Sequence, residues 1–174
     1  MRLAELLDDA LARTPVELVS PLSRDEVLRR LTEAIDSEWV FGGSKPVVGR
    51  VAADGLRLRL RIGYRNSFQT FLFGEVKDDG RGSRINARAG MHPFAAAFMA
   101  LWITAVAVLA LAAVSAMLGS GEDFSAQGLV WLAPLAMVAF GFGLVAMGRW
   151  LARNERAKLV AFLETTAQAK VAAR

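Results

Sequence analysis

Cysteine is absent from this chain of 174 residues, and histidine occurs once, at His92. Without cysteine there can be no disulfide, no thiolate nucleophile, no iron–sulfur cluster and no cysteine-based zinc site. A single histidine cannot build a metal site from several imidazoles. The Ser, Asp and Glu residues show no spacing typical of a catalytic motif. We therefore expect no metal, no cofactor and no enzymatic activity.

Charged side chains are missing from two long runs, residues 94–118 and 128–148. Roughly 20 apolar residues in a helix cross the hydrocarbon core of a bilayer, and both runs reach that length. The residues between them, 119–127, are few and polar, which predicts two antiparallel neighbouring helices. We therefore predict a transmembrane hairpin. A buried helix pair in a soluble protein is the alternative, but residues 1–93 are too few to cover it.

The two apolar runs also lack the ionisable side chains that line ion and proton paths in membranes. This argues against a transporter or pump that acts alone. Small residues recur four positions apart, at Ala112 and Ala116 and at Ala139 and Gly143, and such pairs let helices approach closely. We interpret them as packing within one chain, with dimerisation to a homo-oligomer as the alternative.

Lysine and arginine are absent from residues 119–127 but frequent outside the two runs. The 20 residues before Phe94 hold four of them, and the 20 residues after Gly148 hold another four. Membrane proteins keep such flanking cations in the cytoplasm. The pattern predicts a plasma-membrane protein with both termini cytoplasmic and with residues 119–127 outside.

Residues 1–93 are predicted to form a small cytoplasmic α+β domain. Ser23, followed three residues later by Glu26, is a capping box that predicts a helix over 24–36. A shorter amphipathic helix is predicted over 3–11. Apolar alternation with a period of two predicts strands at 47–52, 56–62, 70–76 and 83–89, with a weaker strand at 16–19.

The short spacings between these strands predict an antiparallel sheet of about four to five strands. The basic tail, residues 149–174, is predicted to be a C-terminal helix. The sequence leaves open whether this helix continues the second membrane span or folds back onto the sheet.

Alternation over residues 56–62 places Arg57, Arg59 and Arg61 on one face of a strand. Beside a membrane, such a row would meet anionic headgroups at about 1 kcal/mol per cation. The alternative is an ordinary solvated outer face. Nucleic acid is not an expected partner, because residues 1–93 hold 15 Lys and Arg against 13 Asp and Glu, a net charge of only +2.

A second candidate is the polar segment that joins two of the predicted strands. Its binding candidates are Tyr64, Arg65, Asn66, Ser67 and Gln69. One interpretation is a binding loop for a lipid headgroup, a peptide or a small ligand. The other is a loop whose hydrogen bonds tie the sheet together.

The run Tyr64-Arg-Asn-Ser-Phe-Gln, followed by the apolar pair and the Arg-rich tail, resembles bacterial inner-membrane proteins of the same layout. That resemblance implies a location in the bacterial inner membrane and no activity. Ser20-Pro21 before a helix, the strands within 47–89 and a C-terminal helix also resemble START-related helix-grip folds. This second resemblance implies a curved sheet around the last helix and an apolar cavity between them.

Three functions follow, in order of preference. The first is a non-enzymatic membrane protein whose tethered domain binds lipid headgroups or a protein partner. The second is a membrane-anchored carrier of a lipid or small hydrophobic ligand, which needs the apolar cavity. The third is an enzyme acting on a membrane substrate, which needs a nucleophile–base pair or a metal site.

Overall fold

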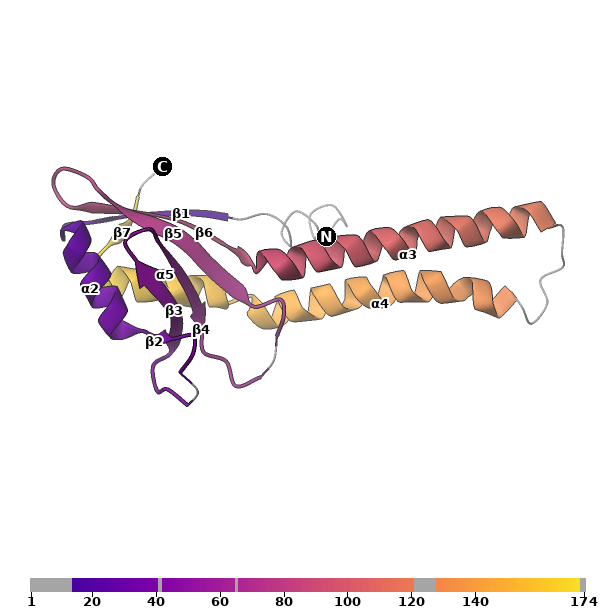
Figure 1. The fold of residues 1–174 in the computed structure, drawn as a ribbon, viewed down its shortest axis with the longest axis horizontal. Coiled ribbons are helices and arrows are strands. Elements are labelled where there is room, and N and C mark those ends of the chain that lie inside the picture. The colour runs from indigo at the N-terminus through magenta and orange to yellow at the C-terminus, as the bar shows by residue number, and fades with distance from the viewer. Residues whose placement is uncertain (1–13, 41, 65, 121–127, 173–174) are drawn as a thin grey trace.

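A computed structural model describes residues 14–40, 42–64, 66–120 and 128–172. An α+β unit lies at one end of the molecule, and two long helices run away from it side by side (Figure 1). The helix predicted over 3–11 lies outside the described residues. The strands are β1 Thr14–Ser20, β2 Asp36–Ser37, β3 Val47–Ala52, β4 Gly55–Leu60, β5 Thr70–Asp78, β6 Ser83–Met91 and β7 Lys170–Val171. The helices are α2 Arg24–Ala34, α3 Pro93–Ser120, α4 Gly128–Ala152 and α5 Glu155–Thr166.

The α+β class is confirmed, and the described sheet has seven strands in the order β2-β3-β4-β5-β6-β1-β7. Strands β3 to β6 form an antiparallel meander, and β1 pairs antiparallel with β6. The five strands expected from the sequence are present. The expectation of a wholly antiparallel sheet of four to five strands was wrong. The two additional strands, β2 and β7, have two residues each, which is too short for a period-two pattern to be detected.

The sheet is mixed because β2 runs parallel to β3, with Asp36 opposite Val48. The other short strand, β7, extends the sheet beyond β1, with Val171 opposite Leu18. The last strand therefore comes from the end of the described chain and joins the strand at its beginning.

One face of the sheet carries the core. In β4, Leu56 and Leu58 are buried while Arg57 and Arg59 lie on the opposite face, as the alternation predicted. Helices α2 and α5 cover the apolar face and contribute the fully buried side chains Val27, Leu31, Leu159 and Leu163. Burial of these side chains is the main source of stability for the domain, at roughly 25 cal/mol per Å² of apolar surface.

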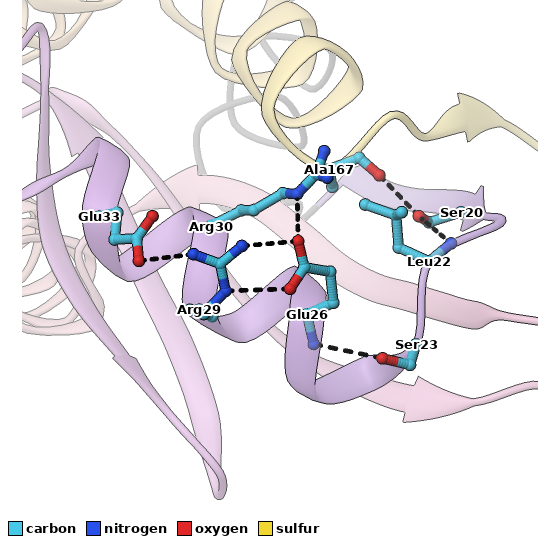
Figure 2. A network of polar contacts seen from close by, with 8 residues as sticks. All are labelled: Ser20, Leu22, Ser23, Glu26, Arg29, Arg30, Glu33 and Ala167. Carbon is cyan, nitrogen blue, oxygen red and sulfur yellow. Dashed lines mark hydrogen bonds and ion pairs between the residues drawn. The ribbon is translucent and has the colours of Figure 1, made fainter.

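Helix α2 begins where the sequence predicted, because the Ser23 Oγ accepts a hydrogen bond from the Glu26 backbone N–H over 3.4 Å. The Glu26 carboxylate accepts hydrogen bonds from Arg29 and Arg30, with Nε–O distances of 2.9 and 2.6 Å (Figure 2). Hydrogen bonds from these two guanidiniums lower the pKa of Glu26 to about 2. The helix ends at Ala34 rather than at residue 36, because the chain enters β2 there.

Helix α5 folds back onto the sheet, which is one of the two arrangements that the sequence left open. The buried Ser20 hydroxyl, at the end of β1, donates to the Ala167 carbonyl just after α5 over 2.6 Å (Figure 2). The same hydroxyl oxygen accepts from the Leu22 backbone N–H. The tail is shorter as a helix than expected, since α5 covers only Glu155–Thr166 and is followed by β7.

Helices α3 and α4 lie against each other along their length (Figure 1). Gly141 of α4 faces the Trp102 ring of α3 so closely that a Cβ at Gly141 would lie 2.0 Å from the ring atom Cζ3. Within the described residues, the stretch Pro93–Ser115 of α3 has the length and composition needed to cross a membrane.

A candidate site where the sheet meets the long helices

The end of the sheet nearest the long helices brings together the start of β1, the start of β5 and the end of β6. The register places Thr14 opposite Ala89 and Thr70 opposite Met91. Helix α3 begins at Pro93, two residues after β6 ends. The bend between α4 and α5 packs against the same end, so four distant segments of the chain meet here.

The loop between β4 and β5 is fixed to the last turns of α4. The Asn66 side-chain Nδ2 donates to the Gly148 carbonyl over 3.2 Å, and its Oδ1 accepts from the Phe68 backbone N–H over 3.0 Å. The Phe68 ring lies on Gly148, where a Cβ would stand only 2.3 Å from the ring atom Cδ2. Glycine is therefore the residue that permits this close approach.

Glu155, the first residue of α5, is 5% exposed. Its Oε2 accepts a hydrogen bond from the Thr70 backbone N–H over 2.6 Å, and Oε1 has no hydrogen-bond partner among the described residues. Burial raises the pKa of Glu155, while the Thr70 hydrogen bonds and the charges of Arg149 and Lys158 act against that rise. The carboxyl group thus joins the start of α5 to the start of β5.

A cavity of about 240 Å³ lies beside this contact. Its lining includes Arg149, Arg153 and Arg156 from the α4–α5 bend, together with Thr14 and Thr70 from the sheet. Three arginine residues therefore line one cavity at the end of the domain from which the long helices leave.

The cationic groups of this cavity differ in their surroundings. Arg153 lies over the ring of Trp150, with 4.5 Å from its Cζ to the ring centroid, and this is a cation–π contact. In the part of the chain that the structure describes, neither Arg153 nor Arg156 belongs to an ion pair.

The predicted arginine row is largely neutralised. Arg57 donates to the Glu38 carboxylate through Nε and Nη2, and Arg61 Nη2 donates to Asp36 Oδ2 over 2.7 Å. Arg59 lies between them on the same strand face and is partly exposed. Two of the three cations already have carboxylate partners, so this face carries less free positive charge than the sequence pattern implied.

The residues of the predicted binding loop divide into two groups. Asn66 contacts α4, and the buried Gln69 donates through Nε2 to the Leu60 carbonyl of β4. These two side chains hold the loop in place, as the second interpretation of this segment proposed. Tyr64 and Ser67 are exposed and stay as binding candidates, and Arg65 lies outside the described residues.

Sequence reasoning did not find the cavity. It used Arg149, Arg153 and Arg156 only to predict membrane orientation. Their close spacing in the sequence was the available signal, although the bend after Ala152 places them on two helices and the turn between them. Nothing in the local sequence connects them with Thr14 or Thr70, because only the pairing of β1, β5 and β6 brings those residues to the same place.

The region between α5 and the sheet, where a helix-grip carrier would hold its ligand, is occupied by side chains. Leu159 and Leu163 of α5 are fully buried in the same core as Leu18, Leu58 and Leu72 of the sheet. A carrier function would require these side chains to move.

Comparisons with protein-family models, with curated proteins and with solved structures find no match to this chain.

Proposed function

We propose that this protein is an integral membrane protein that holds its α+β domain at the cytoplasmic surface of the bilayer and binds anionic lipid headgroups there. The observation that carries this proposal is the direct continuity between an exposed apolar helix, α3, and an arginine-lined end of the sheet. In a bilayer, the acyl chains would contact the apolar helix, and the anionic headgroups would contact the arginines.

The exposed apolar side chains of α3 support the proposal that the long helices are surrounded by a lipid bilayer and not by water. Phe94, Leu101 and Leu111 are 75%, 71% and 69% exposed, and Phe140 of α4 is 64% exposed. Soluble monomers rarely expose contiguous apolar patches of this kind. In the proposed arrangement, α3 and α4 form a transmembrane hairpin whose outward side chains contact acyl chains, and Trp102 packs on Gly141 between the helices.

The end of α4 carries the residues expected at headgroup depth. Trp150 is 60% exposed and stands beside Arg149 and Arg153. Tryptophan and basic residues are both favoured at membrane–water interfaces, the cations on the cytoplasmic side. These residues support an orientation in which the α+β domain is cytoplasmic and the loop 119–127 is outside.

The orientation is tested by labelling single introduced cysteines. Because the sequence contains no cysteine, each variant then has one thiol. We would introduce Ser44→Cys in the α+β domain and, separately, Ser120→Cys at the far end of α3. A membrane-impermeant maleimide is expected to label Ser120→Cys in intact bacterial cells and Ser44→Cys only after permeabilisation. Labelling of both in intact cells, or the reverse pattern, would contradict the proposed topology.

Headgroup binding is tested by mass spectrometry of the molecules that co-purify with the full chain in mild detergent. We expect anionic phospholipid to be enriched over its share of the bulk membrane. A stoichiometric neutral hydrophobe would favour the carrier function instead, and a stoichiometric protein would favour a protein-binding module. Lipid retained in bulk proportions would reject headgroup binding.

A further inference from the structure

The outer face of the sheet, opposite the core, carries Phe71 and Phe73 between Arg59 and Arg88. We propose that this outer face is the docking surface for the chain's own residues 3–11, for which the sequence predicts an amphipathic helix. This docking is independent of the proposed membrane function, because the segment and the face both belong to residues outside the long helices.

Phe71 and Phe73 of β5 form the centre of the outer face. Their ring centroids are 5.8 Å apart at an interplanar angle of 18°, and the His92 ring stands edge-on to Phe71 with 5.1 Å between centroids. Both phenylalanines are only partly buried. Helices α2 and α5 contribute to the core on the opposite face of the sheet, where Leu72 is fully buried. The outer face therefore presents an aromatic surface that no described helix of the α+β unit covers.

An arginine stands on each side of the aromatic pair. The register places Arg59 of β4 opposite Phe71 and Arg88 of β6 opposite Phe73. Among the described residues, neither arginine belongs to an ion pair. The exposed Glu17 of β1 lies on the same face and likewise makes no described ion pair, so the unpaired charge of the face is on balance positive.

Residues 3–11 have the complementary pattern. Five of them share an apolar helix face: Leu3, Leu6, Leu7, Ala10 and Leu11. At 3.6 residues per turn, Asp8 and Asp9 border this apolar face on its two sides, and Glu5 lies opposite it. The segment contains no lysine or arginine. An apolar strip between two carboxylates therefore matches an aromatic pair between two guanidiniums.

The chain brings this segment close to the aromatic pair. Strand β1 begins at Thr14, opposite Ala89, and the neighbouring Gly90 is opposite Phe71. Strand β5 lies two strands away from β1, at about 10 Å for a strand spacing of about 4.8 Å. Residues 12 and 13 span up to about 7 Å when extended, and a helix of nine residues is about 13.5 Å long. The segment can therefore reach the aromatic pair without movement of the sheet.

A second copy of the chain is a poorer occupant of the outer face. Two such faces packed against each other would bring together two copies of Arg59 and Arg88 but only two copies of the Glu17 carboxylate. Like charges that meet across an interface disfavour association. Residues 3–11 supply carboxylates to the same arginines instead.

The test crosslinks pairs of introduced cysteines in the full chain in nonionic detergent, because the sequence contains none of its own. Leu7→Cys, on the apolar side of the segment, is combined with the exposed position Arg88→Cys. The matched control combines Leu7→Cys with Arg84→Cys, on the same face of β6 but about 13 Å farther along the strand. A short dimaleimide should join Leu7→Cys to Arg88→Cys within one chain at least about tenfold faster than to Arg84→Cys, because docking raises the local concentration of one thiol at the other.

Each result of the crosslinking decides the proposal. A preference for Arg88→Cys within one chain supports the docked segment. Equal rates at Arg88→Cys and Arg84→Cys would overturn it, because an undocked segment samples both positions. Crosslinks between two chains would overturn it in favour of a second copy. The absence of crosslinks at both positions would overturn it as well and favour a segment that lies in the membrane interface.

Charge reversal tests the match between the carboxylates and the arginines. Adding Asp8→Lys and Asp9→Lys to the Leu7→Cys and Arg88→Cys pair should slow crosslinking at least about fivefold, because Arg59 then opposes lysines. Adding Glu5→Lys instead changes the charge on the side that faces away, and the rate should stay within about twofold. Equal effects of the two changes would reject the charge match.

Unfolding midpoints of all variants are measured in parallel. Should Arg88→Cys lower the midpoint, Arg59→Cys on the other side of the aromatic pair takes its place. The same preference over Arg84→Cys is then expected, and its absence would overturn the docked segment.

Discussion

The backbone N–H of Thr70, the first residue of β5, donates a hydrogen bond to Oε2 of Glu155, the first residue of α5, over 2.6 Å. The two residues are 85 positions apart, with α3 and α4 between them in the chain. This contact closes the α+β unit, because α5 and β7 belong to the same core and sheet as the strands that precede α3.

Two substitutions of Glu155 should distinguish the contribution of its hydrogen bond to stability from the contribution of its charge. Glu155→Ala leaves the buried Thr70 N–H without a partner and should destabilise the protein by about 1–3 kcal/mol. Glu155→Gln keeps an acceptor oxygen and cannot ionise, so at pH 7 it should be at least as stable as the unmodified protein. Thermal unfolding of the full chain in detergent measures both. Equal losses for the two variants would contradict the hydrogen-bond role.

The stability difference between Glu155→Gln and the unmodified protein should also depend on pH. Because burial raises the pKa of Glu155 in the folded state, the folded protein favours the protonated carboxyl. That stabilising contribution is complete below the ordinary value of 4.5 and is lost as pH rises through the folded value. The advantage of the glutamine variant should therefore grow from pH 4 to pH 7. A constant difference over this range would show that Glu155 does not titrate as the geometry implies.

The contact of Phe68 with Gly148 predicts that one added methyl group at position 148 lowers the stability of the protein. Gly148→Ala places a Cβ where Phe68 Cδ2 would be 2.3 Å away, and overpacking of this kind costs about 1–3 kcal/mol. Gly143→Ala is the matched control, since a Cβ there meets no described atom within 4 Å and should be tolerated. In combination with Phe68→Ala, the Gly148→Ala substitution should cost much less. Additive losses in this double-mutant cycle would refute direct contact.

The packing of Trp102 on Gly141 predicts that a side chain at position 141 destabilises the contact between the two long helices. Gly141→Ala should push the helices apart, because its Cβ would lie 2.0 Å from the Trp102 ring. We expect a lower unfolding midpoint in detergent and a changed tryptophan emission, and Trp102→Ala should restore the midpoint of Gly141→Ala. If Gly141→Ala behaves like Gly143→Ala, the two helices do not pack at this position.

The Glu26 carboxylate predicts an acid-dependent term in the stability of α2. Its pKa is lowered to about 2 by hydrogen bonds from Arg29 and Arg30, so the folded state favours the ionised form. That contribution is present above the ordinary value of 4.5 and is lost as pH falls towards about 2. Unfolding of Glu26→Gln should therefore approach that of the unmodified protein as pH falls through this window. A gap that persists at pH 2 would mean that the carboxylate contributes through packing instead.

Local patterns in the sequence were sufficient to predict much of this fold. The alternation around Leu56 and Leu58 identifies a strand and its buried face because side chains point to opposite sides at every second residue. Ser23 identifies the start of α2 because its hydroxyl satisfies a free backbone N–H. The charge-free run from 94 to 118 predicts a long apolar helix for the same local reason.

The candidate site depended instead on contacts between distant segments. The row of Arg57, Arg59 and Arg61 was visible in the sequence, but its neutralisation by Glu38 and Asp36 required the two-residue strand β2 to lie beside β3. No periodic signal marks so short a strand.

The sequence by itself determined the longer helices and strands and their apolar faces, because these properties depend on residues within a few positions of each other. Only the tertiary structure decided that α5 returns to the sheet, that Glu155 meets Thr70, and that the arginines of the α4–α5 bend border the cavity at its end. These contacts depend on how core burial brings together residues far apart in the chain, and a single sequence carries no local record of that choice.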